Sequence, residues 1–244
     1  MTDHDTIDAQ LLDLMLRAGS RWVLWLLLGL SLLALAVILE RLWFLAQARR
    51  QATRVRAALT ALRSHGPQPA LGLLTEVTSM QAAAARVAIA HLHEGAEAIE
   101  EHIAGALETE RLRYERGLAF LGTLGNNAPF VGLFGTVLGI IRAFSDLSGN
   151  LGQGSQAVMA GIAEALVATG VGLLVALPAV AAFNAFTRYV ETALSEAEAV
   201  RHEILAYVKG RAHLGQPLGP IDAAPPGASA PNTSARPDLK KAAR

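Results

Sequence analysis

One acidic residue, Glu164, lies where an apolar stretch could carry it into a membrane. A charge at mid-membrane costs roughly 2.5–3.5 kcal/mol, so such residues usually face a cavity or a partner. A carboxylate in that position could bind and release protons. Glu164 could equally end its helix near the outer interface, because the start of this span is ill-defined. The sequence leaves both positions open.

Two threonines, Thr136 and Thr169, lie deep in the apolar stretches. A membrane threonine most often hydrogen-bonds the carbonyl four residues earlier in its own helix. If the last two spans pair antiparallel about a link near residues 150–152, Thr136 lies opposite residues 165–169, at the height of Glu164. Glu164 and Thr169 point about 140° apart on an ideal helix. We therefore expect that they do not both face the centre of one pore.

Small residues recur at helical spacing in both stretches, so each stretch has one face that permits close packing. The two faces consist of Gly132, Gly135 and Gly139, and of Ala165, Ala168, Gly172 and Ala176. Packing within one subunit accounts for part of this pattern. Two such faces in a chain with three spans also suggest contacts with further copies.

Two prolines, Pro129 and Pro178, lie inside the same stretches. Each removes one helix hydrogen bond and can kink its helix. Neighbouring helices can satisfy the freed carbonyl in a membrane. The sequence supports two roles equally, plain packing or a fixed hinge.

The composition indicates a membrane protein without an enzyme motif. Of 244 residues, 52% are hydrophobic and only 17% are charged, against about 25% charged in soluble domains. The net charge of zero argues against a dedicated nucleic-acid binder. The absence of cysteine excludes disulfides and thiolate sites. No catalytic residue is predicted, because the sequence has no Walker loop, no Gly-x-Ser-x-Gly and no metalloprotease motif. No metal site is predicted either, since His91 and His93 would face different sides of a helix.

Three apolar stretches predict an all-α integral membrane protein, with transmembrane helices over 22–45, 117–145 and 158–187. A cleaved signal peptide is not expected, because the residues before the first stretch are acidic and its apolar run is too long. Between the first two spans, residues rich in Ala, Leu, Glu and Arg lie on both sides of a Gly-Pro-Gln-Pro break. This pattern predicts a helical hairpin.

The arginines predict the orientation, because they cluster after the first span and before the second. The positive-inside rule places the hairpin, residues 46–116, and a helical extension over 188–213 in the cytoplasm. The N-terminal segment 1–21 and the link 146–157 then lie on the outer side. The tail 214–244 is rich in Pro, Ala, Gly and Ser, and we expect it to be disordered.

Residues 128–140, Ala-Pro-Phe-Val-Gly-Leu-Phe-Gly-Thr-Val-Leu-Gly-Ile, resemble the second span of the ExbB/TolQ/MotA proton-channel family. Residues 161–180 resemble its third span, through Gly-Ile-Ala-Glu-Ala-Leu-Val-Ala-Thr, Gly-Val-Gly and Pro-Ala-Val. Three spans rather than four make the chain more similar to ExbB and TolQ than to MotA.

The resemblance implies a bacterial inner-membrane subunit with a periplasmic N-terminus. It implies a homo-pentamer around two copies of a single-span partner similar to ExbD or TolR, whose aspartate carries the proton. Thr136 and Thr169 would line the pore near that aspartate, with Glu164 on the pore side. Protons would be the coupling ion, and no cofactor is expected. Proton flow would drive mechanical work for TonB-type import, Tol-type envelope maintenance or gliding. A passive membrane scaffold is the alternative.

Overall fold

The computed structural model describes residues 21–149 and 154–214. The predicted tail and nearly all of the predicted outer N-terminal segment lie outside the described residues, as does the middle of the predicted link. The described residues form helices and no strand. The helices are α2 (Arg21–Arg50), α3 (Ala52–His65), α4 (Pro67–Leu74), α5 (Met80–Ala90), η1 (Leu92–Glu94), α6 (Ala96–Glu115), α7 (Leu118–Gly149) and α8 (Gly154–His213).

Within the described ranges, three helical segments are long and apolar enough to cross a membrane: Arg21–His65, Leu118–Leu147 and Val158–His213. Their large apolar side chains are largely exposed in the single chain, as with Trp25 at 72% and Leu174 at 70%. Exposed apolar side chains along such helices fit contact with lipid or with neighbouring membrane helices. The predicted all-helical class is confirmed, and the chain is a multi-pass membrane protein.

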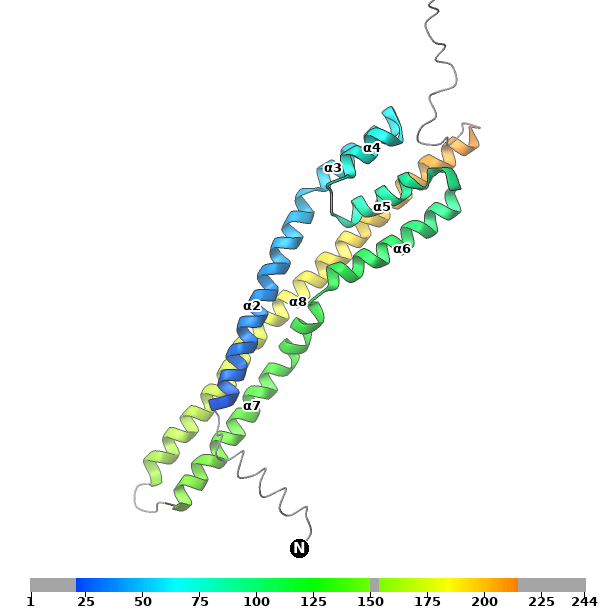
Figure 1. The fold of residues 1–244 in the computed structure, drawn as a ribbon. Coiled ribbons are helices and arrows are strands. Elements are labelled where there is room, and N and C mark those ends of the chain that lie inside the picture. The colour runs from blue at the N-terminus through cyan, green and yellow to red at the C-terminus, as the bar shows by residue number, and fades with distance from the viewer. Residues whose placement is uncertain (1–20, 150–153, 215–244) are drawn as a thin grey trace, which may run out of the picture.

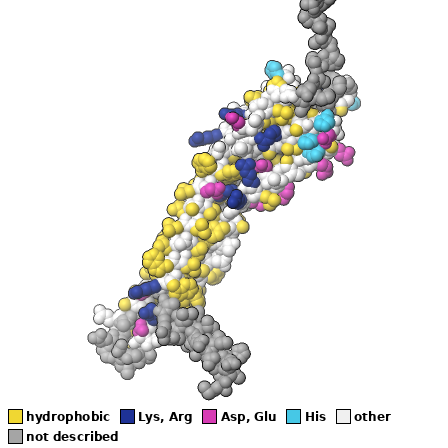
Figure 2. Space-filling model, viewed as in Figure 1, with side chains coloured by type: hydrophobic (Ala, Val, Ile, Leu, Met, Phe, Trp, Pro, Cys, Tyr) yellow, Lys and Arg dark blue, Asp and Glu magenta, His cyan; other side chains and the backbone are white. Residues whose placement is uncertain are grey.

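The molecule is elongated, and α8 runs along most of its length (Figure 1). Helix α7 lies antiparallel beside the first half of α8, and α2 lies along this pair. Helices α5 and α6 pack on the second half of α8. Apolar side chains cover the visible face of the α2–α7–α8 part, whereas charged side chains and histidines gather towards the α3–α6 end (Figure 2).

The hairpin predicted over 46–116 is divided more finely than the sequence indicated. The break that the sequence predicts at the Gly-Pro-Gln-Pro run is present, since Gly66 has a φ of +89° and Pro67 begins α4. Other interruptions, among them the one between α5 and α6, were not predicted. There Gly95 adopts a φ of +93°, in the left-handed region that favours glycine. Residues 80–116 therefore contain two α-helices, although this range has no proline.

The third predicted span and its extension form one uninterrupted helix, the 60-residue α8. A helix of that length is about 90 Å long, which exceeds any bilayer. The predicted link over 146–157 is partly helical, because α7 continues to Gly149 and α8 begins at Gly154.

Candidate functional site

Helices α7 and α8 approach each other closely at Gly132 and Gly172. A Cβ atom added to Gly132 would lie 2.7 Å from the carbonyl oxygen of Ala168. A Cβ atom added to Gly172 would lie 2.7 Å from the carbonyl oxygen of Ala128. Real Cβ atoms essentially never approach so closely. The two helices therefore meet backbone to backbone at this level, as small residues permit.

The same small-residue faces also receive α2. A Cβ atom added to Gly135 would lie 2.8 Å from Cβ of Ala168 and 3.0 Å from Cγ1 of Val23. Gly139 is buried further along α7, near Gly161 of α8. The two predicted faces thus lie against each other within one chain. Contact of these faces with further copies of the chain stays a prediction.

Thr136 and Thr169 are brought together one turn from this close approach. Their hydroxyl oxygens are hydrogen-bonded to each other. Thr136 Oγ1 also lies 3.3 Å from the carbonyl oxygen of Gly132 and 3.2 Å from that of Ala165. The carbonyls only accept, so both hydroxyls are satisfied when Thr169 donates to Thr136 and Thr136 donates to a carbonyl. The bond to Gly132 is the ordinary threonine bond within one helix, and the others cross between helices.

Glu164 makes a different contact. One of its carboxylate oxygens lies 3.3 Å from Nε of Arg21, the first described residue of α2. The two side chains are 41% and 77% exposed. Glu164 lies five residues before Thr169, which is about 7.5 Å along the helix axis. The site therefore consists of a threonine pair between helices and a carboxylate roughly one and a half turns away.

The hydroxyls of Thr136 and Thr169 can relay a proton along their hydrogen bonds, but neither of them carries a charge. A threonine hydroxyl both donates and accepts, yet it does not ionise at physiological pH. Proton transfer along the pair Thr136 and Thr169 would therefore need a carboxylate to bind and release the proton. Glu164 is the carboxylate that the chain supplies nearby.

The prolines leave their helices continuous. Pro129 lies inside α7 and Pro178 inside α8. A hinge at either residue stays a prediction. Near Pro129, the side-chain amide of Asn127 donates to the carbonyl oxygen of Thr123 at 2.7 Å, within its own helix. This bond gives Asn127 a local structural contact that the sequence did not reveal.

Arg41 is one of the arginines that follow the first apolar stretch, and the structure gives it a structural role. It is 5% exposed. Its guanidinium donates two hydrogen bonds of 2.6 Å to the Glu40 carboxylate and one of 3.2 Å to the carbonyl oxygen of Arg113. It also lies 5.1 Å from the ring centre of Phe44. Arg41 therefore ties α2 to the end of α6, just before the second apolar helix begins.

Tyr114, near the end of α6, contacts both α2 and α5. Its hydroxyl accepts a 3.2 Å hydrogen bond from the backbone N–H of Met80, and the residue is 1% exposed. Its ring meets that of Phe44 edge to face at 5.1 Å. Burial raises the pKa of Tyr114 to about 12, so the hydroxyl stays neutral at physiological pH.

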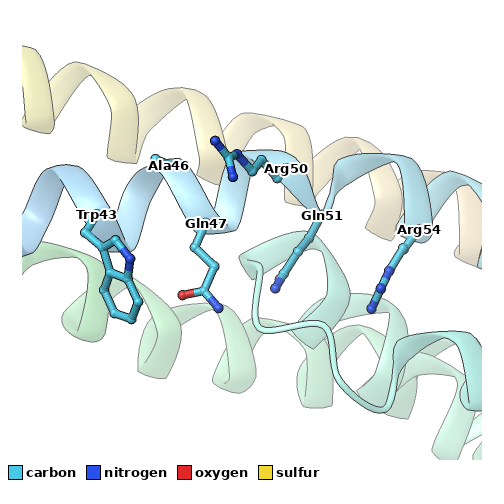
Figure 3. Close-up of a pocket in the computed structure, with 6 residues that line it drawn as sticks. All are labelled: Trp43, Ala46, Gln47, Arg50, Gln51 and Arg54. Atoms are coloured by element: carbon cyan, nitrogen blue, oxygen red, sulfur yellow. The ribbon is translucent and has the colours of Figure 1, made fainter.

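A cavity of about 470 Å³ lies outside the threonine site, at the junction of α2 and α3. Its lining includes Trp43, Gln47, Arg50 and Arg54. Figure 3 shows Trp43, Gln47 and Arg54 pointing to one side of the helix. Tryptophan combined with arginine is typical of the boundary between lipid and cytoplasm. The cavity thus fits the place where the sequence predicts the first span to leave the membrane.

Residues 75–199, half of the chain, match the model of the MotA/TolQ/ExbB proton channel family. The chain belongs to this family. The matched range contains Thr136, Glu164 and Thr169, together with the whole contact between α7 and α8 that positions the threonine pair. The chain is thus a membrane subunit of the proton-channel family, as the resemblance indicated.

Curated relatives carry two kinds of family name. The Tol-Pal system protein TolQ of Pseudomonas aeruginosa is 40% identical over 109 residues, or 44% of this chain and 47% of that protein. The biopolymer transport protein ExbB of Neisseria gonorrhoeae is 45% identical over 93 residues, or 38% of this chain and 42% of that protein. A putative biopolymer transport protein ExbB-like 2 of Helicobacter pylori is 40% identical over 93 residues, or 62% of its length. The chain spans about half the length of these curated relatives.

Proposed function

We propose that this chain is the channel-forming stator subunit of an inner-membrane complex that converts proton-motive force into mechanical work on the cell envelope. The observation that carries the proposal is the hydrogen-bonded pair of Thr136 and Thr169, held between two apolar helices. Membership in the proton-channel family supports it. The proposed activity moves protons and transmits force, and it converts no substrate into a product.

The threonine pair needs a proton carrier, because hydroxyls do not titrate at physiological pH. Glu164 lies on another part of α8 and is paired with Arg21. A single-span partner similar to ExbD or TolR, bearing an aspartate, would supply the carrier beside the pair. We propose two copies of this partner inside a pentamer of the present chain. Exposed apolar side chains on α7 and α8, such as Phe130 and Leu174, offer surfaces for these contacts.

The orientation in the proposal follows the arginines. Helices α3–α6 and the second half of α8 lie in the cytoplasm, and the N-terminus lies in the periplasm. Proton flow past the threonine pair would rotate the pentamer around its partner and deliver force to the periplasmic side. TonB-type import, Tol-type envelope maintenance and gliding motility are the machines that such a subunit could drive.

A passive membrane scaffold is the second candidate. The ion pair between Arg21 and Glu164 favours it, because a carboxylate held by an arginine is suited to joining two helices. A scaffold would keep its function when Glu164 and Thr169 are replaced by alanine. A proton-driven stator would lose it while still assembling.

Native mass spectrometry of the complex, purified with the products of neighbouring genes, tests the proposed assembly. We expect five copies of this chain with two copies of a single-span protein that carries a membrane aspartate. A monomer or dimer without such a partner would leave the threonine pair without a proton carrier and would favour the scaffold.

A further inference from the structure

Two histidines and a glutamate form a cluster at the turn between α5 and α6, far from the threonine pair. His91 follows the last residue of α5, Glu94 ends η1, and His102 lies in the second turn of α6. One ligand atom from each of the three side chains lies within 4.8 Å of the other two. The rings of His91 and His102 stack with their centres 4.1 Å apart.

The backbone fixes this cluster. The N–H of Glu94 donates a 3.0 Å hydrogen bond to the carbonyl oxygen of His91. Gly95 then reverses the chain with its φ of +93°. Ile99 and Ile103 of α6 are buried in the core, whereas His102 is exposed at the surface.

His91 is oriented as a metal ligand would be. Its Nδ1 atom lies 2.9 Å from the carbonyl oxygen of Val87. A carbonyl only accepts, so Nδ1 carries the proton and the lone pair of the neutral ring is on Nε2. Histidines that bind metals usually donate their other ring N–H in this way, and this contact sets the tautomer.

His102 and Glu94 supply the other two ligand atoms. Nε2 of His102 lies 2.9 Å from Oε2 of Glu94, with a proton between them. A metal ion would replace that proton, which leaves to solvent. Zinc bonds of about 2.0–2.2 Å place tetrahedral ligand atoms roughly 3.3 Å apart. Glu94 and His102 are exposed, so both side chains have room to rotate towards that geometry, and the ring of His102 would tilt away from its stacked position on His91.

We propose that His91, Glu94 and His102 bind a divalent transition-metal ion, for which Zn²⁺ is the best match. Two imidazole nitrogens and one carboxylate oxygen suit zinc, copper or nickel, whereas magnesium and calcium prefer oxygen ligands. Water or His93, whose Nε2 lies 3.7 Å from Oε1 of Glu94, would complete the coordination. The bound ion would clamp α6 to the end of α5. The sequence missed this site because the partner of His91 is His102, not His93.

Zinc titration of the full-length chain in detergent tests the proposal. The protein carries a tag without histidines, is first treated with a chelator and then competes for Zn²⁺ with a chromophoric chelator. We expect one tightly bound Zn²⁺ per chain. His102→Gln and Glu94→Gln should each weaken Zn²⁺ binding by at least about tenfold. Replacing a residue that only hydrogen-bonds to a metal ligand already lowers metal affinity by about this factor.

His202→Gln is the matched control. Nδ1 of His202 also lies 2.9 Å from the carbonyl oxygen four residues earlier, but His202 is outside the cluster. This variant should bind Zn²⁺ like the unchanged chain. Cobalt provides a second readout, because Co²⁺ in the unchanged protein should show the strong visible absorption of tetrahedral coordination. The proposal fails if the unchanged chain binds no stoichiometric Zn²⁺, if Co²⁺ keeps its aqueous spectrum, or if His102→Gln binds like His202→Gln.

Discussion

The hydroxyl groups of Thr136 and Thr169 are hydrogen-bonded to each other across the interface of α7 and α8. This contact exists because glycines bring the two backbones together one turn away. Its oxygen atoms lie between apolar helices, where unsatisfied polar groups are costly. The proposed proton pathway at this pair therefore depends on the close packing of α7 and α8.

Gly132→Ala should destabilise the chain. Its new methyl group would lie 2.7 Å from the carbonyl oxygen of Ala168, and overpacking of this kind costs about 1–3 kcal/mol. Gly170→Ala is the matched control, because nothing lies within 4 Å of its added Cβ atom. Unfolding in mixed micelles measures both variants. Equal stability of the two would contradict close packing at Gly132.

The larger substitution Gly132→Leu should separate α7 from α8 and prevent formation of the normal oligomer. Size-exclusion chromatography with light scattering measures the assembly. An oligomer of normal size would show that the small-residue face is not needed for assembly.

Arg21→Gln and Glu164→Ala should have different effects. The ion pair between them is largely exposed, and exposed pairs contribute about 0–1 kcal/mol. We therefore expect Arg21→Gln to change the free energy of unfolding by less than about 1 kcal/mol. Glu164→Ala should abolish proton-driven function in a complementation assay while leaving the oligomer intact. Full function of Glu164→Ala would refute a role for this carboxylate in the proton pathway.

Arg41→Lys should weaken the attachment of α2. Lysine keeps the charge but loses the paired geometry with Glu40 and the bond to the carbonyl of Arg113. Loss of hydrogen bonds to a charged group costs roughly 1.5–3 kcal/mol. The exposed Arg56 offers the control Arg56→Lys, which should cost less than about 0.5 kcal/mol. Chemical unfolding measures the free energy of unfolding of both variants. Equal losses in Arg41→Lys and Arg56→Lys would show that the contacts of Arg41 do not stabilise the attachment of α2 to α6.

Tyr114→Phe should cost about 1–3 kcal/mol, because it leaves the buried N–H of Met80 without an acceptor. The control Tyr207→Phe removes the hydroxyl that accepts from the part-buried guanidinium of Arg211 and leaves no buried backbone N–H without an acceptor, so it should cost less.

Tyr114 also predicts a dependence on alkaline pH. Its pKa rises from 10 to about 12 on folding, so the unfolded chain ionises first. Its contribution to stability is present below pH 10 and is lost as the pH rises towards about 12. Unfolding measured across this range should show a loss that Tyr114→Phe lacks. Identical alkaline profiles would contradict the burial of this hydroxyl.

The sequence predicted that both small-residue faces have close neighbours, and it left open how far these lie within one subunit or in further copies; in the structure α7 and α8 pack on each other through these faces. It also placed Thr136 opposite residues 165–169, and the structure has Thr136 in contact with Ala165 and Thr169. This inference needed only the position of the link and the regular rise of a helix. The proton-pathway roles of these residues stay predictions.

Other contacts could not be predicted, because they depend on the path of the chain. Arg21 and Glu164 are 143 positions apart, and no local pattern relates them. The stacking of His91 on His102 depends on the reversal of the chain at Gly95. Nothing in the sequence distinguishes Gly95 from glycines that lie inside helices. Arg41 is buried because the C-terminal end of α6 packs beside it. The sequence alone does not predict that α6 ends next to α2.

Proton flux through the reconstituted complex tests the central claim most directly. The complex of this chain and its single-span partner is placed in liposomes, and internal acidification is followed after a membrane potential is applied. Thr169→Val preserves the shape of the side chain but removes the hydroxyl that contacts Thr136. The control is Thr192→Val, since the hydroxyl of Thr192 bonds the carbonyl four residues earlier in an exposed part of α8.

We predict that Thr169→Val lowers the flux at least about tenfold, which corresponds to a barrier roughly 1.4 kcal/mol higher. Thr192→Val should conduct like the unchanged complex. Equal flux in the unchanged, Thr169→Val and Thr192→Val complexes would contradict a proton pathway at the threonine pair.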